Sequence, residues 1–295
     1  MFNSKKKTIA IIEVNGPISA SPSKSAISQD GFDLMAVMDF LSSFTRKNRK
    51  PDGILLRLNT PGGTAGASEE LAEAILRVKE KWGIPVVASI ADICCSGGYM
   101  VAVTADRIFA NKQSLTGSIG TIMQIPNYRG LAEKLGVKAY TIKSGEMKDI
   151  GNGFRDMTQE EQEYLEGIAS NGHLIFANFV LKHRKGIKNE TTMMDGRPVS
   201  AVDAKENGLI DAYGTYNDAY EWLLKQIGAD YGNVRDVRMK QKKGIIRRLF
   251  SSMAASILPS SLSGISLLAE IVRLRSITHH LAASPLEVGV CKSPE

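Results

Sequence analysis

The chain has 295 residues, of which 43% are hydrophobic and 23% charged, the balance of a soluble globular protein with a sizeable core. Its formal net charge of +6 arises within residues 233–250, where seven basic side chains face Asp236 alone, so the rest of the chain is electrically neutral. A neutral body argues against nucleic acid as a partner, and the basic stretch is predicted to be a connector.

Cysteine usage argues against disulfides and metal binding. Cys94 and Cys95 are neighbours and make a poor disulfide pair, and Cys291 adds no zinc-type spacing. We therefore expect reduced or buried thiols, no metal site and no cofactor.

We expect no secretory signal at the N-terminus. The apolar stretch after the basic residues 5–7 is short and contains Glu13, unlike a secretory signal. Residues 253–271 are apolar, but Pro259 and Glu270 interrupt them, so they do not form the run of about 20 apolar residues that spans a bilayer. We therefore expect a cytoplasmic or peripherally membrane-associated protein.

In chain order, strand and helix patterns alternate as far as residue 227. Strands are predicted where short apolar runs end in turn residues, and helices where apolar residues recur every three to four positions. The predicted strands are 8–14, 53–58, 84–90, 106–110, 119–125 and 137–142, and the predicted helices are 33–47, 68–82, 99–105, 129–135, 158–183, 200–207 and 216–227. This alternation indicates right-handed βαβ crossovers around a largely parallel sheet, an α/β fold.

The longest predicted helix, 158–183, begins with Thr158 and Glu161 at the spacing of a capping box. Its apolar residues fall largely on one side. We expect it to lie across the domain or against a partner subunit.

The chain divides into a folded domain, 1–232, and a basic connector with a C-terminal tail, 233–295. Arginines flank the interrupted apolar part of the tail. Three interpretations stay open for it: peripheral membrane contact through 233–275, a packed interface helix, or a disordered tail.

The candidate for chemistry is the stretch 93–100, with Ser96 at a corner of small residues. The strand 84–90 leads into it, and Gly97-Gly98 precedes a buried helix. A serine between a strand end and a helix start can expose its hydroxyl beside free backbone N–H groups. The alternative is that these small residues serve only close packing.

A serine nucleophile needs a base, and the four histidines offer none. His173 and His183 lie in the long predicted helix, and His279 and His280 follow the basic connector. A Ser-His-Asp triad is therefore disfavoured.

Lysine is the other candidate base, because burial lowers its pKa from about 10.4 toward neutrality. Lys148 lies in an irregular loop, 143–156, that follows a predicted strand, whereas Lys143 is expected to point to the other face of the strand or to stay exposed. From the residues alone, a solvated Lys148 paired with Asp149 or Glu146 is the simpler interpretation.

Four ordered motifs resemble those of SppA-type signal peptide peptidases in their single-domain form. They are Asn59-Thr60-Pro61-Gly62-Gly63, Cys95-Ser96-Gly97-Gly98-Tyr99, Thr116-Gly117-Ser118-Ile119-Gly120 and Ser144-Gly145-Glu146-Met147-Lys148-Asp149. The resemblance covers roughly residues 8–230, and the joint order and spacing of the motifs make it specific. It implies a ClpP/crotonase-like fold with a largely parallel sheet and flanking helices.

The resemblance also implies a serine peptidase with a Ser-Lys dyad. By this similarity Ser96 is the nucleophile and Lys148 the general base. Ser118 supports the dyad by hydrogen-bonding the lysine amine.

The glycines have roles by the same similarity. The backbone N–H groups of Gly63 and Gly97 form the oxyanion hole, and Gly62, Gly98 and Ser144 contact substrate. Taken singly, Gly62-Gly63 and Ser118 are better explained as an ordinary structural turn and an ordinary turn serine. The joint order and spacing of the motifs favour the catalytic interpretation instead.

The expected partners follow from the resemblance as well. Substrates are extended peptides, signal-peptide remnants or other unfolded apolar segments, which bind as an added strand. The protein is expected to form a homo-oligomer whose subunits share active sites.

Three alternatives remain at this point. A phage-capsid or stomatin-directed peptidase of the same family has the same dyad. A crotonase-like acyl-CoA enzyme keeps a glycine oxyanion hole but does not need both Ser96 and Lys148. A non-catalytic oligomeric scaffold needs neither, and the presence of both residues argues against it.

Overall fold

The centre of the fold is a sheet of apolar strands. In the computed structural model, which describes residues 6–20, 32–47 and 49–239, these are β1 (Lys7–Asn15), β2 (Gly53–Thr60) and β3 (Val86–Cys95). The strands run parallel, and most of their side chains are buried on both faces of the sheet. The predicted largely parallel α/β sheet is confirmed.

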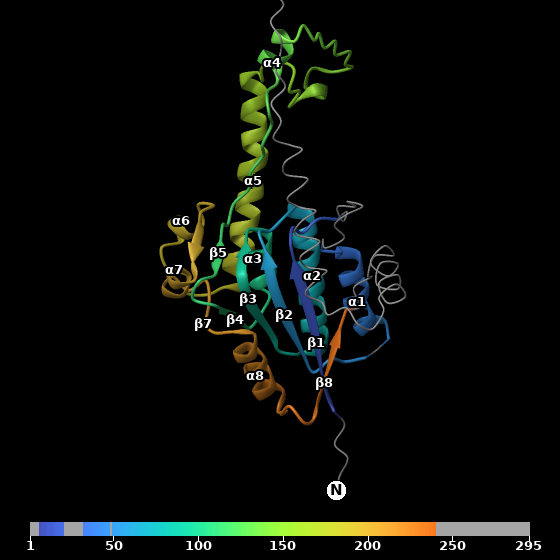
Figure 1. Cartoon of the computed structure of the whole chain (residues 1–295), viewed down its shortest axis with the longest axis vertical. Coiled ribbons are helices and arrows are strands. Elements are labelled where there is room, and N and C mark those ends of the chain that lie inside the picture. The colour runs from blue at the N-terminus through green and yellow to red at the C-terminus, as the bar shows by residue number, and fades with distance from the viewer. Residues whose placement is uncertain (1–5, 21–31, 48, 240–295) are drawn as a thin grey trace, which may run out of the picture. The chain divides into compact units, whose positions relative to one another are not determined.

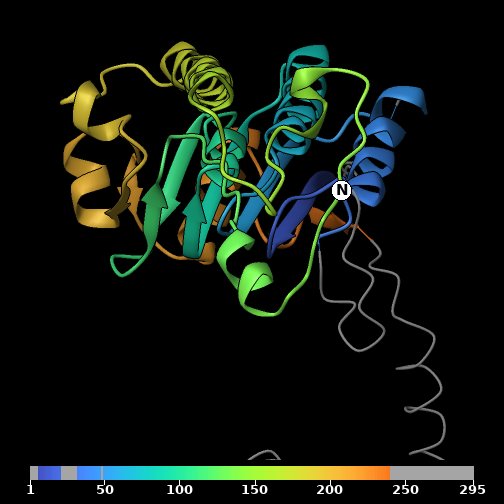
Figure 2. The ribbon, with the colours of Figure 1, turned by 90° about the horizontal axis from the view of Figure 1, so that it is seen from above.

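Different helices cover the two faces of the sheet. Apolar residues of α1 (Leu34–Arg46), α2 (Ala65–Trp82) and α3 (Gly97–Ala102) share one core with the strands. On the other face α8 (Tyr216–Ile227) packs in a smaller core. Figure 2 shows α1, α2 and the long helix α5 (Gln159–His183) along the same face. The flanking helices of the predicted ClpP/crotonase-like architecture are thereby confirmed.

The strand order is β6-β5-β3-β2-β1-β8, and β4 pairs with β3 and β7. All pairs are parallel except β5 with β6. The remaining strands are β4 (Arg107–Ala110), β5 (Leu115–Gly117), β6 (Pro198–Ser200), β7 (Ala212–Tyr213) and β8 (Val234–Arg238). Because β5 pairs with the last residues of β3, Cys95 lies beside Gly117 where both strands end.

Strand β8 lies within 233–295, the segment predicted to be a connector and tail. It pairs in parallel with the start of β1, and Arg238 forms an ion pair with Glu13 at 2.6 Å. The sheet therefore continues past residue 232. The predicted tail beyond it, 240–295, lies outside the described residues.

Helix α5 joins the core to a projecting segment. The Thr158 hydroxyl accepts a hydrogen bond from the Glu161 N–H, and the Glu161 carboxylate accepts one from the Thr158 N–H, so the predicted capping box is confirmed. Near the other end of the helix, Phe176 and Val180 are buried in the core that contains α3. Figure 1 shows the start of α5 extending away from the sheet.

The projecting segment, residues 121–157, is called the arm below. It contains α4 (Arg129–Lys134) and a 3₁₀ helix, η1 (Glu146–Asp149). The predicted strands 119–125 and 137–142 are wrong, because the chain leaves the sheet after β5 and their residues form no strand. Apolar side chains that suggested a buried sheet are exposed instead; Tyr140 and Ile142 are 86% and 100% exposed.

Two short helices, α6 (Glu190–Met193) and α7 (Ala201–Glu206), complete the body. Within the described ranges, no helix is both long and apolar enough to cross a membrane.

One buried hydrogen bond ties the helix after the Ser96 corner to the end of the body. The Tyr99 hydroxyl, fully buried, donates to the Leu209 carbonyl at 2.7 Å, and burial raises the pKa of Tyr99 well above its usual range. Tyr99→Phe leaves that carbonyl unpaired in the core. We expect it to lower the free energy of unfolding by about 1–3 kcal/mol in urea denaturation.

The matched control is Tyr231→Phe, because Tyr231 is largely exposed and its hydroxyl bond is long at 3.4 Å. It should change the unfolding free energy by less than about 0.5 kcal/mol. Equal effects of the two substitutions would contradict a stabilising role for the Tyr99 bond.

Candidate active site

Ser96 stands at a strained corner between β3 and α3. Its φ of 51° and ψ of −126° are rarely adopted by a residue with a side chain. Its N–H donates to the Gly117 carbonyl at 2.8 Å, and its carbonyl accepts from the Tyr99 and Met100 N–H groups. The Ser96 backbone is therefore fixed, while its half-buried hydroxyl makes no hydrogen bond to any described residue.

The turn after β2 packs directly against this corner. Gly62 has a φ of 103°, and a Cβ there would lie 2.7 Å from the Ser96 Cβ and 2.9 Å from the Gly97 nitrogen. The Thr60 hydroxyl accepts a hydrogen bond from the Gly62 N–H at 3.1 Å and holds the turn in place. Only glycine satisfies both the left-handed backbone and the close approach.

Two backbone N–H groups beside Ser96 have no acceptor among the described residues. Gly63 forms a bridge with Ile18, but the bridge uses the Gly62 carbonyl and the Thr64 N–H, which leaves the Gly63 N–H free. The N–H of Gly97, at the start of α3, is also free, and a Cβ on Gly97 would lie 3.5 Å from the Gly63 nitrogen. Paired free donors beside a nucleophile are the arrangement of an oxyanion hole.

Gly98 and Ser68 complete the close packing around the corner. A Cβ on Gly98 would meet the Thr60 methyl group at 2.6 Å, and a Cβ on Gly97 would collide with the Ser68 hydroxyl. Ser68 is fully buried in α2 and donates to the Thr64 carbonyl at 2.9 Å. Gly98 thus supports the packing beneath the corner.

Ser118 reaches the same place from β5. It follows Gly117, the residue that hydrogen-bonds Ser96, and its φ of 51° turns the chain out of the sheet. Its hydroxyl donates to the Gly196 carbonyl at 3.0 Å, and its N–H donates to the Arg197 carbonyl at 2.9 Å. Ser118 therefore lies next to Ser96 and is fixed by the loop before β6.

The two cysteines before Ser96 are poor candidates for a nucleophile. Cys94 and Cys95 are free and buried. Burial raises the pKa of Cys94, and it raises the pKa of Cys95 to about 11. Both thiols stay protonated near neutral pH, and the thiolate is the reactive form.

Lys148 and Ser144 lie apart from this group in the single chain. Lys148 belongs to η1 and Ser144 to the loop before it; both are exposed, and the Lys148 amine pairs with no described residue. Figure 1 shows this part of the arm at the outer end of α5, away from the end of β3.

Helix geometry supports this separation. The turn that holds Lys148 is bound to Glu161, in the first turn of α5, through Arg155. From Glu161 to Phe176, which packs in the core with α3, the helix rises about 22 Å. One chain therefore assembles Ser96, Ser118 and the glycines but not the lysine.

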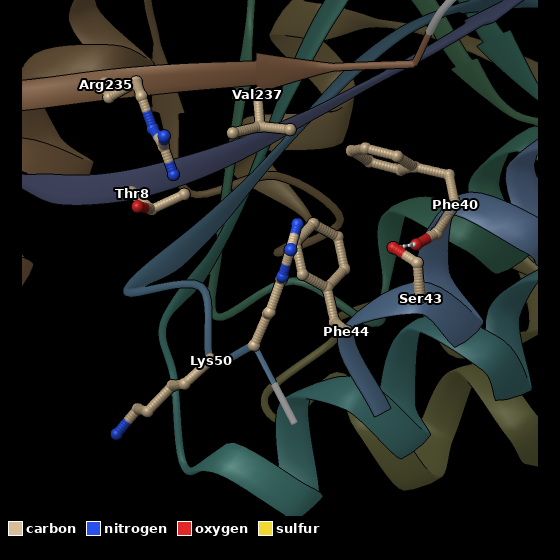
Figure 3. Close-up of a pocket in the computed structure, with 8 residues that line it drawn as sticks. Thr8, Phe40, Ser43, Phe44, Lys50, Arg235 and Val237 are labelled. Carbon is tan, nitrogen blue, oxygen red and sulfur yellow. Dashed lines mark hydrogen bonds between the residues drawn. The ribbon is translucent and has the colours of Figure 1, made fainter. Parts of the chain in front are cut away.

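A separate hollow lies away from Ser96. A cavity of about 580 Å³ separates α1 from β8, with Phe40 and Phe44 facing Arg235 and Val237 (Figure 3). Thr8, at the start of β1, also lines it, whereas Ser96 follows the far end of β3. The described part of the chain has no cluster of three or more side chains suited to a metal ion.

Two residues that shape the surroundings of Ser96 and Lys148, Ser68 and Arg155, were not predicted from the sequence. Ser68 sits on a helix face, where a serine carries no signal of contact with Gly97. Arg155 links Asp149 to Glu161, and its only trace in the sequence is the spacing of opposite charges by six positions.

The fold and the corner define a class of protein. A serine whose hydroxyl has no partner in the described part of the chain stands at the end of a parallel strand, in an α/β fold. Beside it lie two N–H groups that also have no acceptor there. This is the arrangement of hydrolases that stabilise a tetrahedral oxyanion.

Comparison with known proteins is consistent with this class. The sequence profile of peptidase family S49 matches residues 78–230. A putative protease of Methanocaldococcus jannaschii is 39% identical over 200 residues, which cover 68% of this chain and 64% of that protein. A putative protease of Synechocystis is 34% identical over 247 residues, covering 83% of this chain and 84% of that protein.

A third relative, a putative signal peptide peptidase SppA of Enterococcus faecium, is 33% identical over 221 residues, covering 75% of this chain and 64% of the relative. The match thus spans slightly less than two thirds of the archaeal and enterococcal proteins. The chain belongs to peptidase family S49 and is of the SppA type, as its motifs predict.

The Gly62 turn can be tested by adding a single methyl group. Gly62→Ala places a Cβ against the Ser96 and Gly97 backbone in a left-handed conformation, so we expect a loss of about 1–3 kcal/mol of unfolding free energy. Urea denaturation measures this loss.

Gly66→Ala is the control, since a Cβ there meets nothing within 4 Å and α2 begins at Ala65. It should leave stability unchanged or raise it by up to about 1 kcal/mol. A Gly62→Ala protein as stable as Gly66→Ala would show that the close approach is not needed.

Proposed function

We propose that this chain is a serine endopeptidase in which Ser96 is the nucleophile and Lys148 the general base. The observation that carries the proposal is the Ser96 corner, a serine held in a strained conformation beside the free N–H groups of Gly63 and Gly97. A scaffold protein would have no use for such strain.

The proposed reaction has two stages. The Lys148 amine takes the Ser96 proton as Oγ attacks the peptide carbonyl, and the oxyanion accepts hydrogen bonds from Gly63 and Gly97, each worth about 2.7–4 kcal/mol in the transition state. The protonated amine then gives its proton to the leaving amine. Water hydrolyses the acyl-enzyme with Lys148 again as base.

We further propose that the lysine comes from a neighbouring copy of the chain. Within one chain the dyad members lie apart, and Lys148 is exposed. A lysine acts as a base near neutral pH when burial lowers its ordinary pKa of about 10.4. Docking the arm over the Ser96 corner of another subunit supplies that burial.

The surface of the arm and of the adjacent part of α5 supports a shared site. Large apolar side chains are exposed there in unusual number for a monomer. They are Ile122, Met123, Ile125, Tyr128, Leu131, Leu135, Val137, Tyr140, Ile142, Phe154, Met157, Tyr164, Ile168, Leu174 and Ile175. A second copy of this chain that covers them forms a homo-oligomer and completes the site.

The proposed substrates are extended apolar peptides, including signal-peptide remnants. A relative named as a putative signal peptide peptidase favours this class. The peptide adds as a strand beside Gly62-Gly63 and Ser118, so that its carbonyl reaches the N–H groups of Gly63 and Gly97. Gly62 keeps its proposed place in substrate binding, Ser144 contacts the peptide from the arm of the neighbouring copy, and Gly98, buried against Thr60, acts through packing.

Peptide hydrolysis by two variants tests the dyad. Ser96→Ala and Lys148→Ala should each lower kcat by roughly 1,000-fold or more, because each removes one of the groups that move the proton. Lys134→Ala in α4 is the control, since this lysine lies in the arm without an ion partner among the described residues. Activity in a folded, assembled Lys148→Ala protein equal to that of Lys134→Ala would overturn the dyad.

Mixing the two inactive variants tests the sharing of sites. If Ser96 and Lys148 meet from different subunits, co-assembled Ser96→Ala and Lys148→Ala chains in equal amounts contain sites with both groups intact, and about a quarter of wild-type activity should return. Each variant assembled alone is the control. No recovery in verified mixed oligomers would place both residues of each site in one chain.

A further inference from the structure

Arg155 connects the turn that carries Lys148 to helix α5. Its Nε and one terminal nitrogen each donate to a carboxylate oxygen of Asp149 at 2.9 Å. The other terminal nitrogen donates to Glu161 Oε2 at 2.8 Å, and a further bond reaches Glu161 Oε1. One guanidinium therefore clamps the residue after Lys148 to the first turn of the helix.

The clamp is shielded, although it lies in an exposed arm. The side chains of Asp149 and Glu161 are 11% and 3% exposed. Hydrogen bonds from Arg155 lower the pKa of Asp149 and lower that of Glu161 to about 2, so both carboxylates remain charged at neutral pH. Paired and shielded, the three groups form a fixed unit.

Both ends of the clamp are tied to backbone. Glu161 also accepts the Thr158 N–H at 2.9 Å, which fixes it to the start of α5. On the other side, Arg155 donates to the Asp149 carbonyl at 3.3 Å, and the Asn152 N–H donates to the same carbonyl at 3.0 Å. The position of η1 relative to α5 thus depends on Arg155.

We propose that Arg155 is a positioning residue that sets where the Lys148 amine is presented to Ser96 of a neighbouring subunit. This inference rests on the proposed function. Because α5 is rooted in the core at its other end, a turn clamped to its start moves with the body of the subunit. The amine then meets the serine of the neighbouring subunit in a loop that is already ordered. Holding reacting groups in place before the reaction is a large part of catalytic efficiency.

The geometry requires an arginine. A planar guanidinium donates to two carboxylates at once, whereas an ammonium group is a point charge with no fork. Lys143 already reaches Asp149 at 3.0 Å, but it has no contact with Glu161 and so does not join the turn to the helix.

The test compares Arg155→Met with Arg129→Met in the full-length protein. Arg129 lies in the same arm and pairs with two carboxylates, Glu133 and Asp156, but touches neither Asp149 nor Glu161. For Arg155→Met we expect kcat to fall about 100-fold and KM to rise by less than about tenfold, because Lys148 acts in the chemical step and Ser144 is one of several groups that bind the peptide. Arg129→Met should hydrolyse peptide like wild type.

Three further readouts separate positioning from general damage to the fold. The acidic limb of the pH–rate profile should move to higher pH in Arg155→Met, because a loosely held amine is less well buried. Hydrogen exchange should quicken in 143–152 but not in β2. Arg155→Lys should recover only part of the lost activity.

A double-mutant cycle with Asp149→Asn tests the pairing itself. If Arg155 acts through Asp149, the double variant should be no slower than the slower single variant. A double variant whose loss of kcat equals the product of the two single losses would overturn the inference. An Arg155→Met enzyme with wild-type kcat, pH profile and hydrogen exchange would do so as well.

Failure of the proposed function gives a different result. A wild-type protein whose peptide hydrolysis does not depend on Lys148 overturns the dyad and this role together. Lys148-dependent hydrolysis that Arg155→Met leaves intact overturns the role of Arg155 alone.

Discussion

The site depends on the contact between two corners of backbone, the turn at Gly62 and the turn at Ser96. They approach so closely that a methyl group on Gly62 would lie 2.7 Å from the Ser96 side chain. The contact brings the Gly63 and Gly97 backbones together, and neither N–H has an acceptor in the described ranges. Thr60 and Ser68 pack against these turns and support the contact. Both turns consist of small residues because a larger side chain at Gly62, Gly97 or Gly98 would collide with the neighbouring turn or helix.

Much of the fold was predictable, since its core obeys simple periodicity. Apolar runs located β1, β2 and β3, and capping residues located the start of α5. The failures have physical reasons. The arm carries apolar residues with no sheet to bury them, so 137–142 resembled a strand, and β8 is an edge strand whose charged residues resembled a connector.

Motif order predicted which residues gather at Ser96, because strand ends converge at one edge of a parallel sheet. Ser118 and the glycines come together for that reason. The position of Lys148 could not be predicted from the motif order, because it depends on the distance that the 25-residue helix α5 places between the arm and the core. Arg155 was missed because it joins residues of two different elements, Asp149 in η1 and Glu161 in α5, and such ion pairs have no periodic signal in a single sequence.

The arm combines two kinds of surface that are rarely found together in a monomer. Inside, Arg155 and its carboxylates fix its shape with charged groups that water does not reach easily. Outside, it exposes many apolar side chains, which cost free energy in water. An arm with a fixed shape and apolar side chains that it does not bury itself is suited to packing against another molecule. Lys148 belongs to that element and Ser96 to the body, so under the proposed function the catalytic site forms only when the oligomer assembles.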